Sequence, residues 1–268
     1  MAKTILVTGS TDGIGLETAK RLVAQGHTVL LHGRNAAKLE TADREVSAVA
    51  RGGGTETYVA DLSNLTEVSA LSDQIKKQHD RLDVVINNAG VLTAPNPTTE
   101  TGWDVRLVVN TLAPYLLTRK CLSHMSAEGR VVNLSSAAQA PVDLQKLASP
   151  ARMDDMEAYA QSKLALTMWS NALAQTRTDG PIMIAVNPGS LLASKMVKEG
   201  FGVAGNDLGI GADILIRAAL SDEFADANGK YFHNDVGRFG PPHRDALDAA
   251  KCKRLVKGLD ALLAKANF

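Results

Sequence analysis

Thr8-Gly9-Ser10-Thr11-Asp12-Gly13-Ile14-Gly15 is the stretch that decides the fold, and it comes a few residues after the chain begins. The residues just before it, 3–7, are mostly aliphatic, which is typical of a strand buried on both faces of a parallel sheet. The residues after it, 16–26, carry apolar side chains near helical spacing and end in a glycine placed as a C-cap. The stretch is therefore predicted to be a turn from a strand into a helix.

Such a turn can bind an anion. The free backbone N–H groups and the positive dipole end of the helix point at the turn, and glycine lets a diphosphate approach the backbone closely. The spacing is Gly-x-x-x-Gly-x-Gly, which differs from the Gly-x-Gly-x-x-Gly of the commonest dinucleotide fingerprint. A purely structural tight turn is the alternative, because turns favour glycine whatever they bind.

Composition limits the classes of protein to consider. The chain has 268 residues, of which 45% are hydrophobic and 22% are charged, and this size suits one large α/β domain spanning residues 1–268. The formal net charge is zero and the basic residues are spread along the chain, so neither nucleic acid nor an anionic membrane is expected as a partner.

The sequence also bears on location and metals. No apolar run approaches the roughly 20 residues of a spanning helix, so we expect a cytoplasmic protein with no membrane partner. Cys121 and Cys252 are far apart and have no neighbours at metal-ligand spacing, which predicts free thiols and no metal site.

Residues 28–34 are predicted to form a second strand and the loop that ends it, with Gly33-Arg34 at the end. In dinucleotide folds an acidic residue here accepts hydrogen bonds from the adenosine ribose and favours NAD, whereas a nearby arginine accommodates the 2′-phosphate of NADP. Gly33 stands where the acid would be, and Arg34 comes next. The sequence therefore predicts a preference for NADP, and the alternative is that Arg34 is a solvated surface residue.

Two further strand ends carry candidate ligand-binding residues. Asp61-Leu62 follows a strand predicted over residues 56–60, and Asp61 could instead cap the next helix, a role for which Asn64 competes. Asn88-Ala89-Gly90 follows a buried strand that begins at residue 83, and its alternative is an ordinary strand-end turn.

Residues 98–125 are predicted to form one long helix, kinked at Pro114. Asn110 lies ahead of the kink. It is a candidate for a functional side chain at a helix irregularity, and the alternative is a core polar group bonded to backbone.

The predicted catalytic residues come from a strand end and a helix. Ser135 and Ser136 follow a strand that begins at residue 130, and open parallel sheets bind ligands outside such carboxyl ends. Tyr159 and Lys163 are four residues apart, so they lie on the same face of a helix. A nearby ammonium stabilises the phenolate and lowers the tyrosine pKa from about 10, which would suit acid–base work. A structural Tyr–Lys pair is the alternative.

Together these motifs resemble those of the short-chain dehydrogenase/reductase family. The resemblance rests on Thr-Gly-x-x-x-Gly-x-Gly, Asn-Asn-Ala-Gly, the strand ending in two serines, and Tyr-x-x-x-Lys, and it spans nearly the whole chain. It implies a Rossmann-like, doubly wound parallel sheet of about seven strands with helices on both faces. It also implies hydride transfer between nicotinamide and a carbonyl or alcohol carbon.

The resemblance assigns roles to individual residues. Tyr159 would donate the proton, Ser136 would hydrogen-bond the reacting oxygen, Lys163 would lower the Tyr159 pKa and hold the nicotinamide ribose, and Asn110 would support a water in a proton relay. Asp61 would face adenine. The cofactor-binding residues implied are Gly9, Ser10, Thr11, Gly13, Ile14, Gly15, Arg34, Asp61, Leu62, Asn88, Ala89, Gly90, Tyr159, Lys163, Pro188, Gly189 and Ser194.

Two segments narrow the comparison further. The insertion at residues 142–157 and the Tyr-x-Gln-Ser-Lys motif are similar to those of the branch that contains retinol dehydrogenases and their bacterial relatives. Residues 191–207, rich in glycine, are predicted to form a lid over the substrate, with an idle surface loop as the alternative.

The sequence therefore predicts an NADP(H)-preferring oxidoreductase whose partner is a small carbonyl or alcohol compound. NAD is the less favoured cofactor. The alternative function is a regulatory protein of the same fold that senses a dinucleotide without turnover. Relatives often pair through the fourth and fifth helices of the fold, so a homodimer or homotetramer is also considered, although some relatives are monomers.

Overall fold

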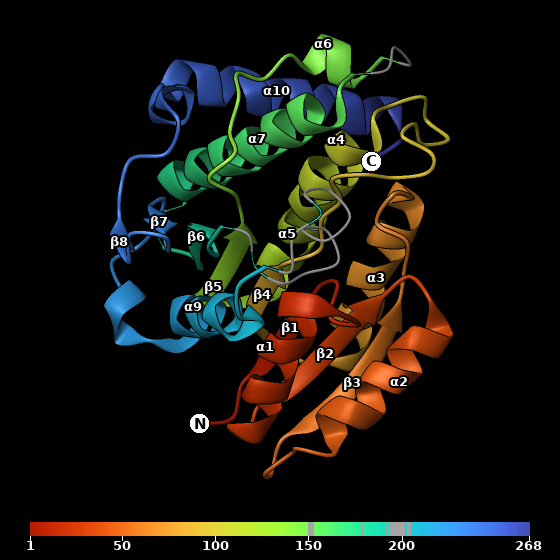
Figure 1. Ribbon diagram of the computed structural model, residues 1–268, viewed down its shortest axis with the longest axis vertical. Coiled ribbons are helices and arrows are strands. Elements are labelled where there is room, and N and C mark those ends of the chain that lie inside the picture. Colours follow the sequence, from red (N-terminus) through yellow and green to blue (C-terminus); the bar gives the residue numbers. More distant parts are fainter. Residues whose placement is uncertain (150–152, 178, 191, 193–201, 203–204) are drawn as a thin grey trace.

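The glycine stretch joins the first strand to the first helix at the middle of a single sheet (Figure 1). The structure is a computed structural model and describes residues 1–149, 153–177, 179–190, 192, 202 and 205–268. Its strands are β1 (Thr4–Val7), β2 (Thr28–Gly33), β3 (Gly54–Val59), β4 (Leu82–Asn87), β5 (Met125–Leu134), β6 (Ile182–Asn187), β7 (Tyr231–His233) and β8 (Arg238–Phe239).

The strand order is β3-β2-β1-β4-β5-β6-β7-β8. All neighbouring strands are parallel except β7 and β8, which are antiparallel. The predicted doubly wound parallel sheet is confirmed, and the two-residue strand β8 adds an edge to the seven strands expected. The chain leaves β1 in one direction towards β3 and leaves β4 in the other towards β7, which makes the β1–β4 boundary the switch point where such folds bind ligands.

Helices cover both faces of the sheet. They are α1 (Gly13–Ala24), α2 (Ala36–Ser47), α3 (Leu65–Gln78), α4 (Val105–Leu107), α5 (Ala113–Cys121), α6 (Leu144–Leu147), α7 (Asp155–Thr176), α9 (Leu208–Leu220) and α10 (Ala249–Lys265). One core cluster packs α1, α2 and α9 against one face, and a second packs α3, α5, α7 and α10 against the other. The sheet is therefore buried on both sides, which is why β1 and β4 are runs of aliphatic residues.

Capping residues fix where the helices begin. Asn64, and not Asp61, caps α3, because its side chain accepts hydrogen bonds from the backbone of Thr66 and Glu67. The Asp61 carboxylate instead accepts from the backbone and hydroxyl of Ser63. The helix-capping alternative for Asp61 is therefore wrong.

The long helix predicted over residues 98–125 is shorter and less regular than expected. Thr98 pairs with Asp104 in an isolated bridge, and Asp104 caps α4, so the helix begins at Val105. A π-helical turn, Val108–Leu112, then joins α4 to α5, and a 3₁₀ turn, Leu122–His124, ends the segment. Pro114 stands in the first turn of α5. Proline has no N–H to donate to the preceding turn, and the sequence therefore predicts a kink at Pro114. In the structure the irregularity is the π-turn just before it.

The remaining irregular elements are short. They are the 3₁₀ turns Asp222–Phe224 and Arg244–Leu247, which lie between α9 and α10. Across the described ranges, no helix combines the length and the apolarity needed to cross a bilayer.

Candidate active site

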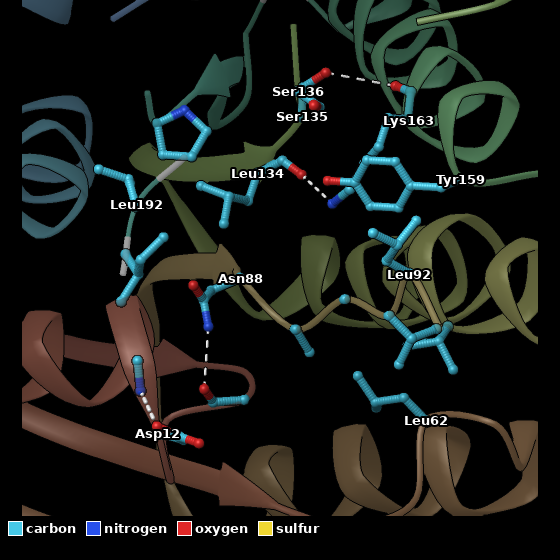
Figure 2. A pocket seen from close by; sticks show the side chains of 18 of the residues that line it. Asp12, Leu62, Asn88, Leu92, Leu134, Ser135, Ser136, Tyr159, Lys163 and Leu192 are labelled. Carbon is cyan, nitrogen blue, oxygen red and sulfur yellow. Dashed lines mark hydrogen bonds between the residues drawn. The ribbon is translucent and has the colours of Figure 1, made fainter. Parts of the chain in front are cut away.

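A cavity of about 800 Å³ lies at the carboxyl ends of the parallel strands (Figure 2). Its walls come from the β1–α1 turn, the ends of the central strands, α7 and the turn after β6. The predicted site residues that line it are Gly9, Thr11, Gly13, Ile14, Arg34, Asp61, Leu62, Asn88, Ala89, Gly90, Ser136, Tyr159, Lys163, Pro188 and Gly189. The fold thus brings together motifs that lie up to 180 positions apart, from Gly9 to Gly189.

The other predicted site residues do not line the cavity or lie outside the described residues. Ser10, Gly15 and Asn110 are buried behind the cavity wall and do not line it. Ser10 bonds within the turn, where its hydroxyl accepts from the backbone N–H of His32 at 2.9 Å. Ser194 and most of the predicted lid lie outside the described residues.

Glycine is required where the turn meets the end of β4. Gly9 adopts a left-handed φ of +64°, and a Cβ there would lie 2.9 Å from the Ala89 Cα. A Cβ on Gly15 would lie 2.3 Å from the Gly9 carbonyl oxygen. The Asn88 amide donates to the carbonyls of Thr8 and Gly9 at 2.8 and 3.1 Å, which ties the two motifs into one cradle.

His32, which no sequence motif identified, hydrogen-bonds the backbone of this cradle. His32 Nδ1 accepts from the Gly9 N–H at 3.1 Å, so Nε2 carries the proton and donates to the Ala60 carbonyl at 3.1 Å. Burial lowers the pKa of His32 to about 4, so the ring is neutral at physiological pH. His32 therefore connects the glycine turn to the ends of β2 and β3.

Two cations lie on the cavity wall beyond the end of β2. Arg34 is exposed, as the surface-residue alternative has it, yet it lines the cavity, and Lys38 in the first turn of α2 lines the same wall. The helix start that aims Lys38 is set by Asn35, whose side chain accepts from the Lys38 N–H at 3.0 Å. The signal for Lys38 was available, since a cation one turn beyond Arg34 lies on the same side of a helix that Asn35 begins.

Gly33, between these cations and the cradle, lies against the Thr11 side chain, which would have to move to admit a side chain at position 33. A Cβ at this position would lie 2.4 Å from Thr11 Cγ2. The place where related NAD-binding folds carry an acid is therefore filled by the methyl group of Thr11.

The two serines after β5 face different partners. The Ser135 hydroxyl pairs with Thr167 Oγ1 at 2.7 Å and lies 3.5 Å from the Lys163 carbonyl, so it is held against the inner side of α7. The Ser136 side chain hydrogen-bonds Tyr159 and accepts from the Ala138 N–H at 3.1 Å. Ser136 is therefore the serine that meets the tyrosine hydroxyl.

Tyr159 and Lys163 lie on one face of α7, with Lys163 Nζ 5.6 Å from the centroid of the tyrosine ring (Figure 2). The lysine donates to the Leu134 carbonyl at 2.7 Å, and burial lowers the Lys163 pKa to about 8. Burial also raises the pKa of Tyr159, and the hydrogen bond from Ser136 only partly offsets this. The sequence predicts a lowered Tyr159 pKa, whereas in the structure this pKa is raised, because desolvation outweighs the stabilisation of the phenolate.

Asn110 lies in the π-turn and is fully bonded by protein groups. Its side-chain oxygen accepts from the Val91 N–H at 2.8 Å, and its nitrogen donates to the Val91 carbonyl and to Ser162 Oγ, each at 2.9 Å. A Cβ on Gly90 would lie 3.3 Å from Lys163 Nζ and 3.4 Å from Asn110 Oδ1, so the three residues meet. The backbone-bonded alternative describes these contacts, and the relay role stays a prediction.

A carboxylate that the sequence reasoning missed shapes the turn around Pro188 and Gly189. Asp235 accepts from the Ser190 N–H at 2.6 Å, from its hydroxyl at 2.8 Å and from the Asn187 amide at 2.8 Å. Burial raises the Asp235 pKa, but these hydrogen bonds outweigh it, so the pKa is lowered and the group is ionised. Since these partners are 45 or more residues away in sequence, no local pattern predicts them.

No group of three or more His, Cys, Asp or Glu side chains among the described residues could hold a metal ion. The cavity wall itself offers the hydroxyl pair Ser136–Tyr159, the buried ammonium of Lys163 and the glycine cradle.

Known proteins resemble this chain in both sequence and structure. The profile of the short chain dehydrogenase family matches residues 3–201. Retinol dehydrogenase 13 of Homo sapiens is 30% identical over 273 residues, covering 94% of this chain and 82% of that protein. Retinol dehydrogenase 12 of Bos taurus is 32% identical, with coverage of 86% and 77%.

A solved structure of a short chain dehydrogenase from Shigella flexneri 2a, complexed with NADP, superposes with a TM-score of 0.69 at 26% identity, covering 87% of this chain and 96% of that one. The family match covers well over half of the chain, and the fold and motifs agree with it. The chain therefore belongs to the short-chain dehydrogenase/reductase family, in its retinol dehydrogenase-like branch, and is an oxidoreductase.

Proposed function

We propose that this protein is an NADP-preferring oxidoreductase that transfers hydride between nicotinamide and a small carbonyl or alcohol compound. The observation that carries the proposal is that Ser136, Tyr159 and Lys163 line the same cavity as the glycine cradle. A protein that only senses a dinucleotide needs the cradle but has no use for the hydroxyl pair.

The residues present fit a dinucleotide phosphate. Gly9 and Gly13 put backbone of the turn on the cavity wall, where a diphosphate can approach it, and Arg34 and Lys38 offer two cations for a 2′-phosphate. Relatives complexed with NADP, such as the Shigella flexneri dehydrogenase, support the same choice. When bound, NADPH supplies the hydride.

The protein supplies the proton and the electrostatics. In the reducing direction the Tyr159 hydroxyl donates a proton to the carbonyl oxygen, while Ser136 hydrogen-bonds that oxygen as negative charge develops. The Lys163 ammonium then stabilises the phenolate that remains. With its pKa raised, the Tyr159 hydroxyl is protonated near neutral pH, as a proton donor must be.

Replacing the acid tests the mechanism. We expect Tyr159→Phe to lower kcat by about 100-fold or more while the Kd for NADPH stays within about twofold, because the proton donor is lost and the cradle is intact. Turnover with a panel of carbonyl compounds and NADPH fluorescence measure the two quantities. Tyr159→Phe turnover equal to wild type would contradict the proposed function.

Replacing the cations tests cofactor choice. We expect Arg34→Ala to weaken NADPH binding about tenfold or more and NADH binding by less than about twofold, since only NADPH carries the 2′-phosphate. Lys38→Ala should act in the same sense with a smaller effect. Equal losses for both cofactors would refute the 2′-phosphate role. NADPH binding without turnover of any carbonyl or alcohol would favour the sensing function instead.

A further inference from the structure

A buried arginine connects the two helical segments that carry the site. The Arg106 side chain is fully buried, and its guanidinium forms a two-pronged pair with Asp104, from Nε at 2.8 Å and from Nη2 at 2.6 Å. Its Nη1 donates to Asp155 at 2.5 Å and to the Leu92 carbonyl at 3.2 Å. One side chain thus joins α4, the loop after β4 and the first turn of α7.

The position of this ion pair relates directly to the site. Arg106 precedes Asn110 by four residues, and Asp155 precedes Tyr159 by four residues, so the pair lies one helical turn before each of them. Beyond Tyr159, a second link joins the same segments, because Asn110 and Thr111 both bond Ser162 at 2.9 Å. Tyr159 therefore lies on a stretch of α7 that is anchored to the π-turn segment on both sides.

The same ion pair is also connected to the part of the cavity wall that Leu92 and Met156 form. Leu92, whose carbonyl accepts from Arg106, lines the cavity, and so does Met156, the neighbour of Asp155 (Figure 2 labels Leu92). A change in this ion pair would shift both the tyrosine and this wall, whereas Gly9, Gly13 and Arg34 lie on the β1–α1 and β2–α2 connections, which the pair does not bond.

We propose that Arg106 and Asp155 are positioning residues for the hydride-transfer reaction: their ion pair sets the spacing between the Asn110 segment and α7, and so places the Tyr159 hydroxyl. The proposal rests on the proposed function for its catalytic part. The link between the two helical segments can be tested without any turnover.

Asp155→Asn is the test variant. Replacing Arg106 would leave the buried Asp104 carboxylate without its cation, and such a variant can fail to fold. Asp155 is one-third exposed, and asparagine keeps its size while the Asp104–Arg106 pair stays intact. Asp155→Glu is the conservative variant that keeps the charge.

A matched control exists elsewhere on the molecule. Arg119 of α5 pairs with Asp260 of α10 at 2.5 Å, which is again an arginine–aspartate link between two helices, but neither residue lines the cavity. Asp260→Asn therefore removes an arginine–aspartate ion pair between two helices, here a solvent-exposed one, at residues that do not line the cavity.

The kinetic arm compares these variants on one carbonyl substrate. We expect Asp155→Asn to lower kcat about tenfold with the KM for NADPH within about twofold, because a misplaced acid slows proton transfer without loosening the cofactor. Asp155→Glu should recover most of kcat, and Asp260→Asn should match wild type. The proposal is overturned if Asp155→Asn keeps the wild-type kcat, if glutamate recovers nothing, or if Asp260→Asn loses as much.

The second arm measures amide hydrogen exchange. We expect Asp155→Asn to speed amide exchange in the first turns of α7. We also expect faster exchange in residues 105–112, the segment that lies across the ion pair from α7. Faster exchange in α7 alone would mean that Asp155 serves only the start of that helix, and would overturn the proposal. Tyr159→Phe, assayed alongside, separates the two ideas: if it turns over like wild type, the proposed function fails, while the exchange result still decides the link.

Discussion

Asp12 places a negative charge where the site is expected to bind phosphate. Its carboxylate is exposed, lines the cavity and caps α1 by accepting from the Gly13 N–H at 2.6 Å (Figure 2). The cap stabilises the helix, but the charge opposes an anion at the same helix end. If the cradle binds phosphate as proposed, this cap would serve the fold while its charge lowers the affinity for the cofactor.

Asp12→Asn separates the two effects. Because asparagine caps a helix as well as aspartate does, we expect unchanged thermal stability and about two- to fivefold tighter NADPH binding. The gain should shrink at high salt, where charge repulsion is screened. Fluorescence titration at low and high ionic strength measures it, with Glu40→Gln, an exposed acid outside the cavity, as the control. Equal or weaker binding by Asp12→Asn would show that its carboxylate does not repel the cofactor.

Single residues were predictable where a motif or a local spacing identifies them. The i, i+4 pair of Tyr159 and Lys163 sufficed to place both on one wall, and Ser136, predicted from the family pattern as the catalytic serine, is the serine that bonds the tyrosine, while its catalytic role stays a prediction. His32 and Asp235 were missed because their partners come from other elements of the fold. The direction of the Tyr159 pKa was wrong for a related reason, since the degree of burial is set by packing and not by spacing.

At the scale of elements, apolar runs predicted the strands well and helix starts less well. The central strands β1, β4 and β6 are mostly apolar and buried, and such runs have few alternatives in an α/β chain. The helix over residues 98–125 was overextended because Trp103 looks like part of an apolar helix face. In the structure its carbonyl instead accepts from Thr99 in a turn ahead of α4. The π-turn was foreseen only as an irregularity ahead of Pro114.

The whole molecule has a terminal helix that bears on its assembly. Figure 1 shows α10 lying along α7, and residues 161–170 of α7 are all buried within this one chain. On the adjacent α5, Tyr115 and Arg119 both bond Asp260 of α10. The helices through which relatives often pair are thus already covered by a helix of the same chain.

We therefore expect a monomer in solution, in place of the homodimer or homotetramer considered from the sequence. Light scattering coupled to gel filtration should give a mass near 28.4 kDa at micromolar concentration. A stable mass of twice or four times this value, independent of dilution, would contradict the prediction and require a different interface.

The contact between Thr11 and Gly33 has an evolutionary consequence. An acidic residue at position 33, the simplest route towards NAD, would bring its Cβ to 2.4 Å from Thr11 Cγ2. The benefit of such a mutation therefore depends on whether the Thr11 side chain turns aside or is replaced by a smaller one. This dependence is epistasis between two sites 22 positions apart in sequence.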